Sequence, residues 1–120
     1  MNVFCEQAEF CTVVKVEGDI SVPDSERFKD FLLQRIGNGT TDFILDFSGV
    51  PYVDSSGVSA LLKLVQLARQ EGGDIRLVGL NNRLNKLFEQ VGLQHVFRRF
   101  ESLENGINSY GSAEPVGTTE

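Results

Sequence analysis

Hydrophobic and polar positions change their spacing several times along the chain, and each change marks a structural element. Two stretches rich in β-branched and aromatic residues, 3–5 and 10–16, are separated by polar residues and predict an antiparallel hairpin. Apolar residues then recur every three or four positions, which predicts a helix over residues 22–36. Ser21 is expected to cap this helix, and Pro23 to occupy its first turn.

The middle of the chain predicts a buried strand followed by a long amphipathic helix. Residues 43–47 are almost continuously apolar, which is typical of a strand inside a sheet. Beyond them, apolar positions form a helical stripe that ends at Gly72 and Gly73. The stripe consists of Val58, Leu61, Leu62, Val65 and Ala68, widened by Leu64 and Leu67. We expect Leu61, Leu62 and Val65 to be buried against the sheet.

The last third of the chain predicts two further strand and helix pairs. The strands are expected at residues 75–80 and 96–100, and the helices at residues 82–91 and 103–110. Strands that alternate with helices imply an α/β fold, here with a mixed, mostly parallel sheet, an antiparallel N-terminal edge and about four helices. We expect one domain over residues 1–110. Residues 111–120 are rich in glycine and small polar residues and are expected to form a disordered tail.

Charge and hydropathy exclude several classes of function. The 120 residues carry a net charge of −6; residues 1–56 hold ten acidic and four basic side chains, and the remainder holds seven of each. An acidic chain repels phosphate backbones, so we expect no nucleic-acid partner. No apolar segment approaches the roughly 20 residues that span a bilayer, and no signal peptide precedes the first strand, so we expect a cytoplasmic protein without membrane insertion. The acidic half suits a basic partner, although a solvated acidic face without a partner explains the same charges.

The side chains that could support catalysis or metal binding form no recognisable set. Cys5 and Cys11 have neither the spacing of a CxxC pair nor further metal ligands, so we interpret both as strand packing residues and expect no metal and no cofactor. An enzyme could use Ser55 or Ser56 as nucleophile and His95 as base. That lone histidine has no acidic residue nearby in sequence, and no Gly-x-Ser-x-Gly elbow is present. The sequence therefore favours a protein that is not an enzyme.

The segment between the buried strand and the long helix holds the most informative polar residues. It includes Asp54, Ser55, Ser56 and Gly57. Loops at this end of a parallel sheet commonly meet ligands and partners, and the first turn of a helix offers unpaired N–H groups. The same residues also have a purely structural explanation, in which Asp54 and Ser55 cap the helix and Gly57 allows close packing.

Five segments, in register with the family's motifs, resemble the STAS domain of bacterial anti-sigma-factor antagonists. They are VEGDI at 16–20, ILDFSGV at 44–50, VDSSGV at 53–58, GGDIRLV at 72–78 and LFEQVGL at 87–93. The resemblance covers residues 3–110 and implies the STAS fold. It also implies that the unmodified protein binds an anti-sigma factor, itself a serine kinase, and so frees a sigma factor.

The resemblance implies a phosphorylation switch as well. The family's kinase modifies the second serine of the Asp-Ser-Ser-Gly motif, which points to Ser56, and a serine phosphatase would reset the switch. The residues expected to bind the partner are Ser21, Asp24, Asp54, Ser55, Ser56 and Gly57. Ser21 stands where the family commonly has an acidic residue. The alternative is a STAS interaction or scaffold subunit of a stress-signalling or transport complex, which binds a constant partner without switching.

Overall fold

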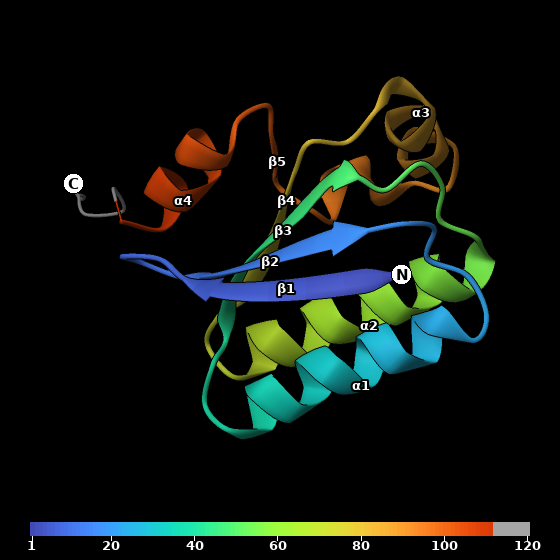
Figure 1. Cartoon of the computed structure of the whole chain (residues 1–120). Coiled ribbons are helices and arrows are strands. Elements are labelled where there is room, and N and C mark those ends of the chain that lie inside the picture. Colours follow the sequence, from blue (N-terminus) through green and yellow to red (C-terminus); the bar gives the residue numbers. More distant parts are fainter. Residues whose placement is uncertain (112–120) are drawn as a thin grey trace.

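The computed structural model describes residues 1–111 as a five-stranded sheet with helices on both faces (Figure 1). The strands follow one another across the sheet in chain order, and only the first pair is antiparallel. They are β1 (Asn2–Gln7), β2 (Thr12–Glu17), β3 (Asp42–Gly49), β4 (Asp74–Val78) and β5 (Arg99–Phe100). The described helices are α1 (Asp24–Gly37), α2 (Ser55–Gln70), α3 (Asn82–Gln90), the short 3₁₀ helix η1 (Leu93–His95) and α4 (Leu103–Gly111). The predicted fold class is confirmed.

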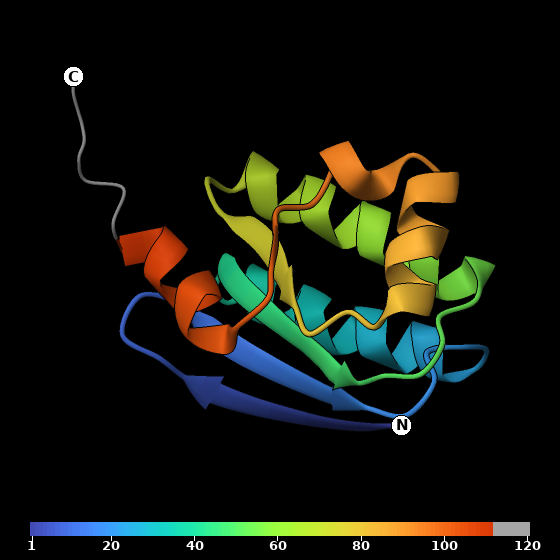
Figure 2. The ribbon, with the colours of Figure 1, turned by 90° about the horizontal axis from the view of Figure 1, so that it is seen from above.

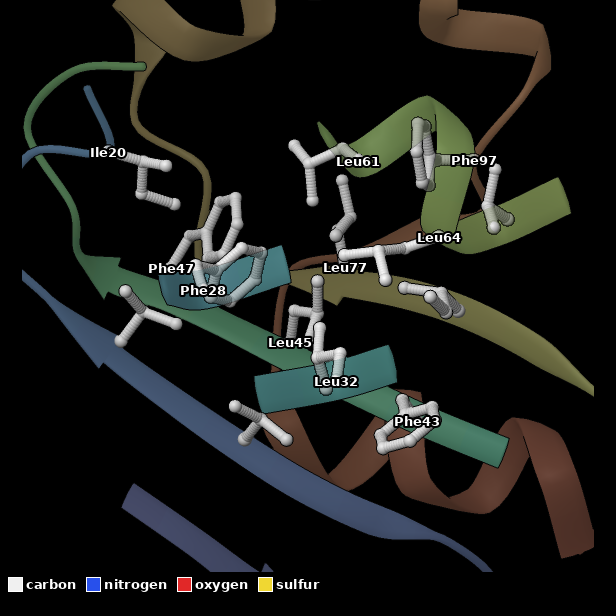
Figure 3. Close-up of a cluster of buried hydrophobic side chains, with 14 of the residues drawn as sticks. Ile20, Phe28, Leu32, Phe43, Leu45, Phe47, Leu61, Leu64, Leu77 and Phe97 are labelled. Carbon is white, nitrogen blue, oxygen red and sulfur yellow. The ribbon is translucent and has the colours of Figure 1, made fainter. Parts of the chain in front are cut away.

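Side chains alternate between the two faces of the sheet, and different helices cover each face. On β2, Val14 and Val16 belong to the cluster beneath α1 and α2, whereas Val13 belongs to the cluster beneath α4. Figures 1 and 2 show α1 and α2 side by side on one face and α4 on the other. The larger cluster is drawn in Figure 3, which labels Ile20, Phe28, Leu32, Phe43, Leu45, Phe47, Leu61, Leu64, Leu77 and Phe97.

Polar contacts fix α4 to its face of the sheet. The Tyr110 hydroxyl lies 2.6 Å from the carbonyl oxygen of Phe43 and 2.8 Å from that of Asp74. The Arg76 guanidinium lies over the Tyr110 ring, 3.8 Å from its centre. At Gly106 an added side-chain carbon would lie 2.8 Å from Val78, so the missing side chain lets α4 approach β4 closely. Among the described residues no helix combines the length and hydropathy needed to cross a membrane.

The N-terminal hairpin corrects two expectations. The second strand begins at Thr12, because Phe10 and Cys11 belong to the connection between β1 and β2. Cys11 is buried there, as a packing residue should be, but Cys5 is exposed, so its interpretation as a packing residue is wrong. The physical reason is that β1 is an edge strand, and of its side chains only Val3 is partly buried.

Two helix boundaries also differ from expectation. Helix α1 begins at Asp24, with Pro23 in the capping position and without a side-chain cap, so the predicted capping role of the Ser21 hydroxyl is wrong. Ser21 contributes its carbonyl oxygen instead, which accepts a hydrogen bond of 2.8 Å from the N–H of Ser25. At the other end of the chain, Gly111 was expected to begin the tail but is the last residue of α4. The rest of the expected tail, residues 112–120, lies outside the described residues.

The last two strands are shorter than the sequence predicts. Strand β4 ends at Val78, because Gly79 adopts a φ of +77° and turns the chain. Val96 and Phe97 were expected in the last strand, but η1 precedes them and β5 holds only Arg99 and Phe100. Phe97 is buried against Phe88, with 6.0 Å between the ring centres. An apolar residue at position 97 is therefore explained by packing in the core and not by pairing within a strand.

Candidate functional site

Two loops, one from β2 to α1 and one from β3 to α2, meet at the same end of the sheet. The N–H of Ile20 donates to the carbonyl oxygen of Tyr52 at 3.0 Å, and the N–H of Asp54 donates to that of Ile20 at 3.1 Å. At Gly57 an added side-chain carbon would lie 2.5 Å from Val53 and 2.9 Å from the Ile20 oxygen. Glycine at this position therefore lets α2 begin directly against the paired loops, as the structural explanation of Gly57 predicted.

Asp54 caps the N-terminus of α2 and anchors the site. Its Oδ1 atom accepts hydrogen bonds from the N–H of Gly57 at 3.0 Å and from the hydroxyl of Ser56 at 2.5 Å. The Ser56 bond first, and then the Gly57 bond, hold the pKa of Asp54 below its usual value. Asp54 is therefore a carboxylate at neutral pH. The pKa of Asp54 is lower in the folded protein than in the unfolded chain, so its ionised form stabilises the fold. This stabilisation is fully present at a pH above the pKa in the unfolded chain, and it is lost as the pH falls through the pKa in the folded protein.

Ser56 also contacts a second serine, which sequence reasoning missed. The hydroxyl oxygens of Ser56 and Ser25 lie 2.8 Å apart, although the two residues are 31 positions apart in the chain. Ser25 lies in the first turn of α1 and is only 3% exposed. A sequence feature could have revealed it, because Ser25 is in helical register with Phe28 and Leu32 on the buried side of α1. A polar residue on that side requires a hydrogen-bond partner, and Ser56 is that partner.

Ser55 is exposed, and within residues 1–111 its side chain makes no hydrogen bond that could cap α2. The predicted capping role of Ser55 is therefore wrong. The cap lies one residue earlier, because the Asp54 carboxylate already accepts the N–H of Gly57.

The structure separates the remaining predicted partner-binding residues into two places. Ser21 lies half-buried in the loop beside Asp54. Asp24 lies in the first turn of α1, where its carboxylate pairs with the Arg27 guanidinium and lies 3.5 Å from the amino group of Met1. The hydrogen bond from Arg27 is the main reason why the pKa of Asp24 is lowered. Asp24 is therefore partly neutralised within this chain, whereas Asp54 and Ser56 form one connected cluster.

Two exposed apolar side chains lie on the paired loops next to that cluster in sequence, one on each loop. Val22 is 69% exposed and Tyr52 is 38% exposed. The Arg83 guanidinium lies 4.8 Å from the centre of the Tyr52 ring and supports it from α3. Together with Asp54, Ser55 and Ser56, these two residues form what we call the loop surface. Sequence reasoning missed Val22 and Tyr52, because a single apolar residue in a loop has no periodic pattern.

A groove of about 450 Å³ runs from the loop surface between α1 and α2. It is lined by Val22, Ser25, Glu26, Lys29, Ser56, Ser59, Ala60 and Lys63. Lys29 forms an ion pair of 3.0 Å with Glu26. Two basic side chains therefore line the same groove as Ser56, Lys29 from α1 and Lys63 from α2.

The geometry gives no support to a serine hydrolase. His95 lies exposed in η1 and lines a pocket with Arg69, near the C-terminal end of α2. Ser56 lies at the opposite end of that helix, about 20 Å away at 1.5 Å per residue. Among residues 1–111 no three His, Cys, Asp or Glu side chains are grouped so that they could hold a metal ion.

Replacement of the capping residue should separate the roles of the neighbouring side chains. Asp54→Ala is expected to lower the melting temperature by several degrees, because the first turn of α2 loses its acceptor and Ser56 loses its partner. Ser55→Ala, the matched control, should change stability by no more than about 0.5 kcal/mol. Thermal unfolding followed by circular dichroism measures both. Equal losses in the two variants would contradict the assignment of the cap.

Comparison with known proteins gives concordant results. The family model described as the STAS domain matches residues 4–106. The anti-sigma-B factor antagonist of Bacillus subtilis is 26% identical over 107 residues, which cover 89% of this chain and 97% of the relative. An anti-sigma factor antagonist from Mycobacterium paratuberculosis has a similar crystal structure, with a TM-score of 0.83, 17% identity, and coverage of 92% of this chain and 94% of that one.

A further solved structure shows a related protein in a modified state. It is the Bacillus cell fate determinant SpoIIAA in its phosphorylated form. Its TM-score to this chain is 0.72 at 21% identity, and the match covers 90% of this chain and 98% of that one. At this level of identity the likeness establishes a common fold.

Proposed function

Because the chain belongs to the STAS domain family, we propose that it is an anti-sigma factor antagonist, a regulator without enzymatic activity of its own. In this proposal the unmodified protein binds an anti-sigma factor that is also a serine kinase, and the sigma factor is thereby freed for transcription. The observation that supports it most directly is the position of Ser56. Its hydroxyl lies at the start of α2, in contact with Asp54 and at the centre of the loop surface.

The loop surface has the chemistry that a protein partner would use. Val22 and Tyr52, one on each of the paired loops, supply exposed apolar area. Asp54 supplies a carboxylate that suits a basic group on the partner. Ser21 and Gly57 belong to the same region, and Asp24 is the first residue of α1. No nucleic-acid contact is part of the proposal. The proposed kinase uses ATP, so the proposal includes a cytoplasmic location, where ATP is available.

Phosphorylation of Ser56 would release the partner through a local change of charge. It adds about −1.5 to −2 charges to an oxygen that now lies 2.5 Å from the Asp54 carboxylate. An unpaired charge at a dehydrated interface costs about 3 to 5 kcal/mol, which corresponds to a loss of affinity of roughly 10² to 10³ or more. The dipole of α2 would stabilise the phosphate by only about 0.3 to 1 kcal/mol. Release therefore dominates, and a serine phosphatase would restore binding.

Phosphate mapping tests this proposal directly. We expect one of the anti-sigma factor kinases encoded in the same genome, incubated with this protein and ATP, to place phosphate on Ser56, as located by mass spectrometry. The Ser56→Ala protein should accept no phosphate, and the matched Ser55→Ala protein should accept it normally. Phosphate on Ser55, or no phosphate from any of these kinases, would contradict the switch and favour the scaffold role.

A further inference from the structure

A phosphoryl group on Ser56 could not keep the contacts that the hydroxyl makes now. The ester oxygen has no proton to donate to Asp54, and the phosphate and carboxylate charges repel one another at this range. The other neighbour of the hydroxyl, Ser25, is buried in the first turn of α1 and has a single hydroxyl group as donor. A phosphorylated side chain therefore has to turn toward the open side of Ser56.

That open side is the groove between α1 and α2, and two lysines line it with Ser56. The two helices run side by side in the same direction, and both begin at the loop surface (Figure 1). Lys29 follows Ser25 by one turn of α1, and Lys63 follows Ser56 by two turns of α2. Long side chains on a helix lean toward its N-terminus, and the Lys29 ammonium does so, since it contacts Glu26 three residues earlier. The same preference would direct the Lys63 side chain along the groove toward Ser56.

We propose that Lys29 and Lys63 form a phosphate-binding cradle that holds the phosphoryl group of Ser56 within this chain. This proposal rests on the proposed phosphorylation of Ser56, and it concerns where the added phosphoryl group binds within the modified protein. An ammonium group from each helix donates to the phosphate oxygens, which are stronger acceptors than the carboxylate that Lys29 now contacts. The phosphorylated form is thereby stabilised as a free protein, in addition to being excluded from the partner complex.

The charged side chains around the cradle determine whether the second pKa of the phosphate rises or falls. Lys29 and Lys63 favour the dianionic phosphate, whereas Asp54 and Glu26 oppose it. Asp24, on the same turn of α1 as Ser25, is paired with Arg27 and the amino group of Met1 and opposes it less. Removal of either lysine should therefore raise the second pKa of the phosphate. A hydrogen-bonded ammonium group lies about 4 Å from the phosphorus, and at that separation in water one unit charge changes a pKa by about three quarters of a pH unit.

The test uses protein with phosphoserine incorporated at position 56 during translation, so that no kinase is needed. Titration of the ³¹P resonance gives the second pKa of the phosphate. We expect Lys63→Gln and Lys29→Gln each to raise it by about three quarters of a pH unit relative to the unsubstituted phosphoprotein. The matched control is Lys86→Gln on α3, because Lys86 lines a different pocket with Tyr52 and Arg83. That substitution should leave the pKa unchanged.

The outcomes separate the cradle from the phosphorylation switch. An unchanged pKa in either Lys63→Gln or Lys29→Gln would overturn the two-lysine cradle, whether or not a kinase modifies Ser56. The same rise in the Lys86→Gln control would also overturn it, since the effect would then be one of overall charge. Conversely, a rise confined to the two groove variants supports the cradle even if the kinase assay places no phosphate on Ser56, a result that would contradict only the proposed function.

Discussion

Leu64→Ala is expected to lower the free energy of unfolding by about 2 to 5 kcal/mol. Leu64 is fully buried between α2 and the sheet, within the cluster that Figure 3 shows. Removal of its side chain leaves a cavity that the packed strands cannot close completely. Urea denaturation followed by circular dichroism measures the loss.

Leu62→Ala is the matched control on the same helix. The sequence predicted Leu62 among the buried residues of the stripe, but its side chain is only partly buried, whereas Leu61, Leu64 and Val65 are fully buried. Leu62→Ala should therefore cost clearly less than Leu64→Ala, because part of the removed surface is already in water. A loss as large for Leu62 as for Leu64 would contradict the way in which α2 lies on the sheet.

Ser56→Asp is expected to weaken binding to the anti-sigma factor kinase by roughly 10²-fold or more. The substitution brings a second carboxylate next to Asp54 at a surface that binding dehydrates. One charge imitates a phosphate incompletely, so the loss should be smaller than that caused by phosphorylation itself. Calorimetric titration of the purified kinase with each variant measures the affinity.

Ser56→Ala is the control for this prediction. It should keep the fold and bind the kinase constitutively, because it can accept neither phosphate nor charge. It also leaves the buried Ser25 hydroxyl without its partner, so a loss of stability of about 1 to 3 kcal/mol is expected without a loss of binding. Equal affinity of Ser56→Asp and Ser56→Ala would argue against a charge-operated switch and in favour of the scaffold role.

The hydrophobic pattern predicted the elements of this fold well, because strands and helices place apolar residues at different intervals. Residues 43–47 read as a buried strand because β3 is covered on both faces. The errors arose where a side chain's role depends on residues that are distant in sequence. Phe97 was assigned to a strand because its contact with Phe88 in the core has no local pattern. Cys5 was interpreted as a packing residue, although an N-terminal edge was expected, because nothing in the sequence shows how few side chains of that edge strand are covered.

The sequence predicted which loop holds the candidate site, but it did not predict the contacts between the side chains of that site. The sequence directed attention to Asp54 and Ser56, which the structure joins by a hydrogen bond. It could not show which of two adjacent residues caps α2, because Asp54 and Ser55 are both good capping residues. It could not show that Ser25 and the groove lysines lie beside Ser56, since that arrangement depends on the packing of α1 against α2.

One measurement tests the central claim most directly, namely that charge on Ser56 controls partner binding. The dissociation constant for the anti-sigma factor kinase is measured by calorimetry with the unmodified protein and with protein that carries phosphoserine at position 56. We predict specific binding of the unmodified protein and an affinity at least about 10²-fold lower for the phosphorylated one. Equal affinity of the two forms, or no binding by the unmodified protein, would contradict the account.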